Sequence, residues 1–301
     1  MKTYVRIFCY LMLLLTANVY AADQFSNYYP HVKEATTWLK AHSGNAHPTL
    51  MIVLTGGVDG PEKLLTDKKY IKAADIPHFP HTRVQGHAGK LVFGKLDGVD
   101  VVLLKGRYHY YEGWSPRDVV FPYFVLNALG VKSVITVNAV GGIREDLNTG
   151  DLVLVTDHIN GMGVNPLWGI AIQRKEHQFT DMTSPYYPQY QELAKTKALQ
   201  LGFVLKEGIY LSVPGPSYET KSEIGMFRKW GADTIGMSTA LEVIASNFLG
   251  MKVLSMSIVT NPAADRHQGS MDHKEVIDAV STASPKISAL VTECAKEIVK
   301  S

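Results

Sequence analysis

The sequence is poor in cysteine and carries little net charge. Its 301 residues contain 2 cysteines, and 30 Lys and Arg stand against 28 Asp and Glu, a formal charge of +2. So few cysteines cannot build a disulfide framework. A near-neutral chain without a basic run interleaved with aromatics lacks the electrostatic signature of nucleic-acid binding. We therefore expect no nucleic-acid partner.

Motifs of metal, thiol and serine-hydrolase chemistry are also missing. The chain has no Cys-x-x-Cys, no His-Glu-x-x-His and no Gly-x-Ser-x-Gly. The 11 histidines are scattered and lack the spacing of metal ligands. Zinc-site, dithiol and nucleophile-elbow hypotheses therefore have no support.

The N-terminus has the pattern of a secretory signal peptide. Lys2 and Arg6 precede an apolar run over 7–15, and Val-Tyr-Ala at 19–21 fits an A-x-A-like cleavage site. We predict a signal peptide over 1–21 and a catalytic domain over 22–301. The apolar run is short for a membrane span, although an uncleaved anchor is an alternative. The expected mature protein is periplasmic or secreted, without stable membrane association.

The remaining chain alternates between two kinds of segment, without repeats, low-complexity segments or linkers. Apolar, β-branched runs predict strands at 50–55, 91–93, 99–104, 133–137, 152–156 and 253–259. Helical patterns bounded by Pro or Gly cover 116–129, 188–201, 219–230, 239–249 and 273–299. This alternation predicts a single α/β domain with a central mixed, mostly parallel β-sheet flanked by helices. The Asp97-Gly98 pair predicts an antiparallel hairpin within it.

Three of the predicted strands end in polar or glycine-rich segments. These are Thr-Gly-Gly at 55–57, Asn-Ala-Val-Gly-Gly at 138–142 and Thr-Asn at 260–261. Ligands of open α/β sheets bind beyond the carboxyl ends of strands. The sequence therefore predicts a binding site where these ends converge.

The segment 106–113 has the residues of an anion site. In an extended continuation of the preceding strand, Arg107, His109 and Tyr111 would face one side. A guanidinium beside an imidazole suits a phosphate dianion, because Arg offers forked donors. The alternative is a surface loop with a structural arginine and aromatics that fill gaps.

Two further segments carry weaker anion signals. The glycine-rich turn 55–60 lets backbone N–H groups approach an anion, but it lacks the Gly-Lys-Ser/Thr of a P-loop. A tight strand-to-helix turn is the simpler interpretation of this segment. Ser238 or Thr239 could bind an anion at a helix N-terminus, or could simply cap that helix.

The last two segments could recognise a heterocycle. Tyr218 and Glu219 follow a stiff Pro-Gly-Pro turn, where a carboxylate could accept from a ring N–H beside a stacking aromatic. Glu219 could instead only stabilise the start of a helix. Asn261 both donates and accepts and so could bind a ring edge, although Asn-Pro is also an ordinary turn.

Together these segments resemble the trimeric purine nucleoside phosphorylase family, which includes methylthioadenosine phosphorylase. The likeness runs from about 49 to 297. The specific stretches are 86–89 (Gly-His-Ala-Gly), 106–113, 138–142, 157–160 (Asp-His-Ile-Asn), 215–220 and 236–239 (Gly-Met-Ser-Thr). Each is short, but they occur together and in the family's order.

The resemblance implies phosphorolysis of a purine nucleoside to the free base and pentose 1-phosphate, by direct attack of inorganic phosphate. It implies a homotrimer, no metal, no organic cofactor and no covalent enzyme intermediate. Matching positions imply catalytic roles for His109, Glu219 and Asn261; phosphate contacts from Arg107, His109, Ser238, the Ala139 backbone and His87; ribose contacts from Tyr111, Met237 and His273; and base contacts from Tyr218, Glu219 and Asn261.

Asn261 sets the expected substrate, because the family's 6-oxopurine members have Asn here and methylthioadenosine members have Asp. Inosine and guanosine are therefore expected over adenosine. The chain departs from the family at Gly56, where a phosphate-binding serine is usual, at Asp59, which adds negative charge, and at Pro262. An exported nucleoside-binding protein without turnover and a methylthioadenosine phosphorylase are the alternatives.

Overall fold

The computed structural model describes residues 27–82, 84, 89–173, 179–270 and 272–300, with the side chain of His273 left out. The predicted signal peptide over 1–21 and the predicted phosphate-site residue His87 lie outside these ranges. Within them, no helix has the length and apolar character needed to cross a bilayer.

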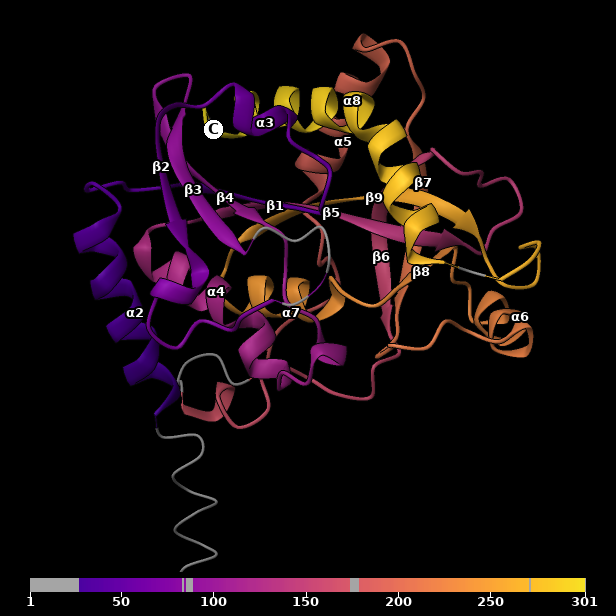
Figure 1. Cartoon of the computed structure of the whole chain (residues 1–301), viewed down its shortest axis with the longest axis horizontal. Helices are drawn as coiled ribbons and strands as arrows, with labels where there is room; N and C mark the ends of the chain where they lie inside the picture. Colours follow the sequence, from indigo (N-terminus) through magenta and orange to yellow (C-terminus); the bar gives the residue numbers. More distant parts are fainter. Residues whose placement is uncertain (1–26, 83, 85–88, 174–178, 271, 301) are drawn as a thin grey trace, which may run out of the picture.

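The elements alternate between strands and helices for most of the chain (Figure 1). The strands are β1 (Leu50–Leu54), β2 (Thr66–Lys72), β3 (Lys90–Leu96), β4 (Val99–Lys105), β5 (Ser133–Gly142), β6 (Leu152–Asn160), β7 (Lys206–Ser212), β8 (Thr234–Gly236) and β9 (Lys252–Pro262). The helices are α2 (Tyr28–His42), α3 (Gly60–Lys63), α4 (Pro116–Leu129), α5 (Pro188–Gln200), α6 (Lys221–Lys229), α7 (Ala240–Phe248) and α8 (His273–Ile298), with short 3₁₀ turns η1 (Ala73–Asp75), η2 (Tyr110–Glu112) and η3 (Ala171–Gln173).

The strands form one mixed sheet in the order β2-β3-β4-β1-β5-β8-β7-β6-β9. An additional parallel pairing of β5 with β9 closes the last five strands on themselves. The central strand β1 pairs in parallel with β4 and β5, while β2, β3 and β4 form an antiparallel meander. The expected α/β domain with a mixed sheet is confirmed.

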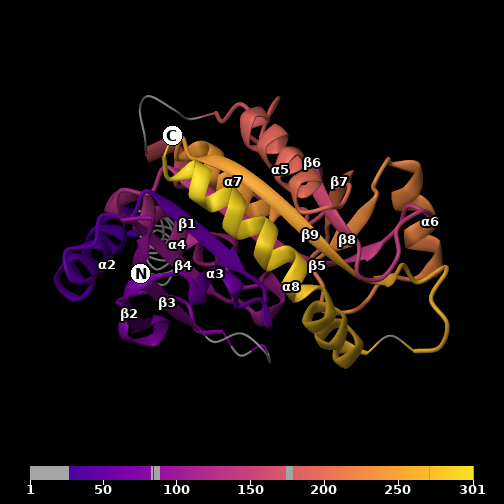
Figure 2. The same cartoon turned by 90° about the horizontal axis from the view of Figure 1, so that it is seen from above.

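Helices cover both faces of the sheet. Figures 1 and 2 show α8, α5 and α3 on one side, with α4, α7 and the outer helix α2 on the other. The two largest apolar clusters follow the alternation of the strands. On β1, Ile52 packs toward α8, and Met51 and Val53 pack toward α4. These strands are therefore buried on both faces, as their continuous apolar runs predict.

Local signals in the sequence place several boundaries. Pro116 opens α4 behind a capping box in which the Ser115 hydroxyl accepts from the Asp118 amide, and Gly130 ends the helix with φ +135°. Asp97 and Gly98 both have positive φ and join β3 to β4, as the hairpin prediction requires.

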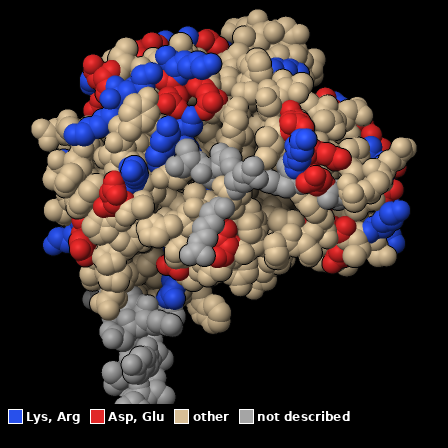
Figure 3. Space-filling model, in the orientation of Figure 1, with Lys and Arg blue, Asp and Glu red and all other residues tan. Residues whose placement is uncertain are grey.

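The edge strand β2 has no counterpart in the sequence prediction. Six of its seven residues are exposed, so the two-residue period of a half-buried strand is missing. Lys68 and Lys69 lie on this edge, and Figure 3 shows basic side chains gathered on that side of the molecule. Exposed lysines on an edge strand hinder pairing with another chain.

Three strands continue into the polar segments that follow their predicted apolar runs. β5, β6 and β9 extend to Gly142, Asn160 and Pro262, because their polar ends remain paired within the sheet. The expected helix start at Glu219 is wrong by two residues. The capping box between Thr220 and Glu223 fixes the first turn of α6 at Lys221.

Candidate active site

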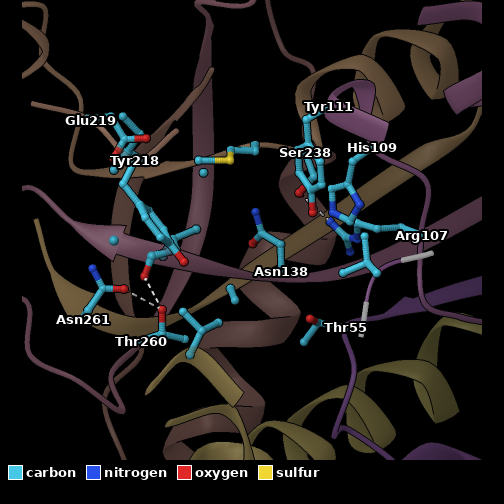
Figure 4. A pocket seen from close by; sticks show the side chains of 18 of the residues that line it. Thr55, Arg107, His109, Tyr111, Asn138, Tyr218, Glu219, Ser238, Thr260 and Asn261 are labelled. Atoms are coloured by element: carbon cyan, nitrogen blue, oxygen red, sulfur yellow. Dashed lines mark hydrogen bonds between the residues drawn. The ribbon is translucent and has the colours of Figure 1, made fainter. Parts of the chain in front are cut away.

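The three polar strand ends converge on one pocket, as predicted. Thr55 follows β1, Asn138 lies in the second half of β5, and Thr260 and Asn261 lie near the end of β9. Nine predicted site residues line this pocket: Arg107, His109, Tyr111, Ala139, Tyr218, Glu219, Met237, Ser238 and Asn261. In Figure 4, Arg107, His109 and Ser238 lie at one end of the pocket, and Glu219 and Asn261 lie at the other.

The positive end is organised around the buried guanidinium of Arg107. Its Nη1 donates to the hydroxyls of Ser238 at 2.9 Å and Thr239 at 2.8 Å. Its Nη2 donates to the Thr136 hydroxyl at 3.2 Å and to the Val137 carbonyl at 2.5 Å. Arg107 therefore holds Ser238 in position as well as bringing positive charge to this end.

A carboxylate inside α7 balances this charge. The Glu242 Oε2 lies 3.5 Å from the Arg107 Nη1, and both side chains are almost completely buried, at 3% and 2% exposure. Removing one member of a buried ion pair leaves the other charge uncompensated, which costs about 3–5 kcal/mol. The site is therefore built on an ion pair that contributes to both stability and electrostatics.

Ser238 does not cap α7, although its hydroxyl and that of Thr239 were candidates for this role. Thr239 occupies the N-cap with φ +68° and makes no side-chain cap bond, because its hydroxyl accepts from Arg107. The Tyr210 hydroxyl accepts from the Ser238 amide at 3.1 Å and donates to the Ser238 carbonyl at 2.8 Å. These bonds hold the Ser238 hydroxyl at the pocket wall.

His109 continues the positive end from the turn after β4. Its Nδ1 lies 3.1 Å from the Glu112 carboxylate, which also accepts from the His109 amide at 2.8 Å. The imidazole stacks on the Tyr111 ring, with centroids 4.6 Å apart. Burial lowers the pKa of His109 despite the opposing effect of Glu112. The His109 imidazole is therefore held in the neutral form near pH 7. Burial also raises the pKa of Tyr111, to about 12.

Glu219 and Tyr218 form part of the opposite end, in the segment before α6. Burial raises the pKa of the Glu219 carboxyl. Tyr218 is 39% exposed and its ring lines the pocket, so it offers a partly open apolar surface. Gly215 in the preceding turn has φ +66°, and a Cβ there would collide with the Met237 side chain. A glycine is therefore needed where this turn packs against the pocket wall.

Asn261 is oriented by its neighbours on β9. Its Oδ1 accepts from the Thr260 hydroxyl at 2.9 Å, and its Nδ2 donates to the Pro262 carbonyl at 2.9 Å. The amide keeps a second N–H and further lone pairs for a ligand. The unusual Pro262 thus contributes a carbonyl that orients Asn261.

The altered glycine-rich turn keeps one hydroxyl at the pocket, because Thr55 lines it. Asp59, whose charge was expected to oppose an anion, forms an ion pair with Lys105 at the end of β4. Lys105 also binds Glu62 at 2.5 Å, and these contacts raise the pKa of the lysine against the effect of its burial. Lys105 is therefore shared between two carboxylates and offsets only part of the negative charge of Asp59.

Two predicted residues are not placed in the site, because the His87 residue and the His273 side chain lie outside the described part of the chain. Two functional candidates were missed. Asn138 lies in the stretch 138–142 that carries part of the resemblance, but the resemblance implies no role for its side chain. Glu242 lies inside an apolar helix, where a single carboxylate gives no sequence signal. Within the described ranges, no group of three or more His, Cys, Asp or Glu side chains could hold a metal ion.

Comparison with known proteins identifies the family. A model of the phosphorylase superfamily matches residues 51–296, so the chain belongs to this superfamily. Purine nucleoside phosphorylase 1 of Geobacillus stearothermophilus is 39% identical over 269 residues, which cover 89% of this chain and 96% of the relative. Purine nucleoside phosphorylase of Bos taurus is 35% identical over 271 residues, covering 88% and 93%. Within the superfamily, the chain is therefore a member of the purine nucleoside phosphorylase family.

A solved structure agrees with this assignment. The crystal structure of schistosoma purine nucleoside phosphorylase in complex with hypoxanthine matches with a TM-score of 0.83 and 31% sequence identity. The match covers 89% of this chain and 96% of the other. The family predicted from the sequence is confirmed.

Proposed function

We propose that this protein catalyses phosphorolysis of 6-oxopurine nucleosides, with inorganic phosphate as co-substrate and without a metal or organic cofactor. One observation carries the proposal: a single pocket has the Arg107 guanidinium and the Ser238 hydroxyl at one end and the Glu219 carboxylate and the Asn261 amide at the other. The two ends suit an anionic nucleophile and a heterocyclic leaving group, with room for a pentose between them.

The proposed reaction exchanges one bond at the anomeric carbon for another. A phosphate oxygen forms the C1′–O bond while the C1′–N9 bond breaks and its electron pair leaves with the purine. The transition state resembles an oxocarbenium ion, with positive charge on the sugar and negative charge on the departing base. Phosphate held beneath the sugar stabilises the first charge, and a hydrogen-bond donor at the purine stabilises the second.

Each end of the pocket has a proposed part in that step. Arg107 and Ser238 bind phosphate, together with the Ala139 backbone. Neutral His109 directs its one N–H to Glu112, so its Nε2 accepts from the O–H of the phosphate dianion. Glu219 accepts from the purine ring, and the free Asn261 N–H donates to N7 as it gains electrons. The predicted ribose contacts from Tyr111, Met237 and His273, and the predicted phosphate contact from His87, complete the proposal.

Asn261 supports a preference for inosine and guanosine, since its free N–H can donate to O6 or to N7 of a 6-oxopurine. The test is base release from inosine, guanosine, xanthosine, adenosine and methylthioadenosine, with and without phosphate. We expect phosphate-dependent release that is fastest for the 6-oxopurine nucleosides. Faster turnover of methylthioadenosine would favour the methylthioadenosine phosphorylase alternative.

The exported binding-protein alternative has lost its main motive. It rested on the altered turn at Gly56 and Asp59, but Lys105 forms an ion pair with Asp59, and Thr55 places a hydroxyl at the pocket. Saturable binding of nucleosides without base release at any phosphate concentration would restore this alternative.

The proposed assembly is a homotrimer, in keeping with the resemblance. Three large apolar side chains around η3 support self-association: Trp168 is 80% exposed, Ile172 63% and Phe179 94%. Exposed apolar groups that cluster are typical of protein interfaces. Light scattering of the parent and of Phe179→Ala is expected to give three chains for the parent and weaker association for the variant.

The proposed location is the periplasm or the exterior, after removal of residues 1–21. The support is the sequence pattern alone, with Lys2 and Arg6 before the apolar run over 7–15. Mass spectrometry of the purified native protein is expected to find Ala22 at the N-terminus. A chain that begins at Met1 would contradict cleavage.

A further inference from the structure

Asn138 is a pocket residue with no role in the proposal so far. It lies in the second half of β5, is 2% exposed and lines the pocket. In Figure 4 its amide lies between the Arg107–Ser238 end and the Asn261–Glu219 end. The amide nitrogen is buried and has no hydrogen-bond partner among the residues that the structure describes. Such a donor is costly unless a ligand accepts from it.

Ser257 on β9 fixes which way this amide faces. The two residues are direct neighbours in the parallel β5–β9 pairing, and the Ser257 hydroxyl donates to the Asn138 Oδ1 at 2.6 Å. Ser257 is completely buried, and the adjacent Met256 and Ile258 face the apolar layer on the other side of the sheet. The side-chain oxygen of Asn138 is therefore held by Ser257, and the side-chain NH₂ group faces the pocket.

We propose that Ser257 is a positioning residue, which holds the Asn138 amide so that its NH₂ group donates to a bound substrate oxygen. The inference rests on the proposed phosphorolysis. Without the Ser257 hydroxyl, the amide loses the bond that distinguishes its oxygen from its nitrogen. If the amide flipped, its oxygen would face the pocket in place of the NH₂ group. This oxygen and the substrate oxygen are both acceptors, and they would repel each other.

The substrate atom is an acceptor oxygen near the middle of the pocket. Between the anion end and the base end, this oxygen belongs to a pentose hydroxyl or to the phosphate. The kinetic constants separate the two sources. A contact to phosphate raises the KM for phosphate when the donor is lost. A contact to the 2′-hydroxyl instead reduces the preference for inosine over 2′-deoxyinosine.

The experiment compares six proteins: the parent, Asn138→Ala, Asn138→Asp, Ser257→Ala, the Asn138→Ala/Ser257→Ala double variant and the control Ser255→Ala. Ser255 is the matched control, because it lies two residues earlier on the same face of β9, is 1% exposed and makes no bond to Asn138. Asn138→Asp serves as a nearly isosteric second variant, which keeps the acceptor for Ser257 but has no donor.

We expect Asn138→Ala and Asn138→Asp each to lose about tenfold in kcat/KM for phosphate or for inosine. Ser257→Ala is expected to lose about threefold or more, and Ser255→Ala to match the parent. The double variant is expected to match Asn138→Ala, because Ser257 acts only through the amide. Thermal melting checks that each variant is folded.

Two results would overturn the inference. One is a parental kcat/KM in both Asn138 variants. The other is a Ser257→Ala loss that persists in full when Asn138 is already alanine, since this would show an independent structural effect. If the parent itself releases no base, the proposed phosphorolysis fails. The same variants are then ranked by calorimetric affinity for inosine and for phosphate, and equal affinities would reject the positioning role as well.

Discussion

Replacing Arg107 separates the catalytic from the structural function of the buried ion pair. Arg107→Ala removes a charge that lies 3.5 Å from the Glu242 carboxylate, inside a region where both side chains are buried. It also removes the donors to the Ser238 and Thr239 hydroxyls. The single variant is therefore expected to lose both stability and phosphate affinity. Arg107→Ala/Glu242→Gln removes the uncompensated carboxylate but does not restore the positive charge.

The structure sets the size of both effects. An unpaired buried carboxylate costs about 3–5 kcal/mol, and we expect Arg107→Ala to lose stability in that range. Restoring neutrality with Glu242→Gln should recover about half of this loss or more. A charge-assisted hydrogen bond contributes about 1.5–3 kcal/mol, so kcat/KM for phosphate should fall about a hundredfold in both variants.

Urea unfolding and steady-state kinetics at varied phosphate measure the two effects independently. The double variant should be more stable than Arg107→Ala and equally impaired toward phosphate. A double variant that regains parental kcat/KM for phosphate would refute the role of Arg107 in binding the anion. A single variant as stable as the parent would instead refute the structural role assigned to the ion pair.

Three further predictions concern single residues. Asn261→Asp should shift the inosine-to-adenosine ratio of kcat/KM toward adenosine by about tenfold or more, because a carboxylate cannot donate to O6. An unchanged ratio would exclude Asn261 from base recognition. Lys105→Met should raise the KM for phosphate about two- to fivefold by leaving Asp59 and Glu62 uncompensated, and adding Asp59→Gly should reverse part of the change. His109 has a folded-state pKa lowered by burial, so the unfolded state binds more protons and stability is lost as pH falls below the ordinary value of 6.5. His109→Asn should therefore lose less melting temperature than the parent between about pH 7.5 and about pH 5.5, and an equal loss in both proteins would contradict this assignment.

Much of the site could be predicted from the sequence because its residues lie at the ends of apolar strands. Thr55 follows β1, and Asn138 and Asn261 follow the apolar parts of β5 and β9. The topology of an α/β sheet brings the carboxyl-terminal parts of such strands together. The convergence predicted from three separate segments is therefore a consequence of the fold class.

The partners of these residues could not be predicted, because they depend on tertiary packing. Glu242 reads as an ordinary polar residue in an apolar helix, yet the packing of α7 places it against Arg107. Ser257 interrupts an apolar strand without any motif, and only the β5–β9 register places it beside Asn138. Likewise, no local pattern pairs Lys105 with Asp59.

The most direct test of the central claim follows a labelled phosphate through the reaction. The mature protein is incubated with inosine and ³²P-labelled phosphate, and hypoxanthine and labelled pentose phosphate are measured together. The account predicts one labelled pentose 1-phosphate for each hypoxanthine released, and no release without phosphate. Hypoxanthine accompanied by free ribose, or tight binding of inosine without any release, would contradict it.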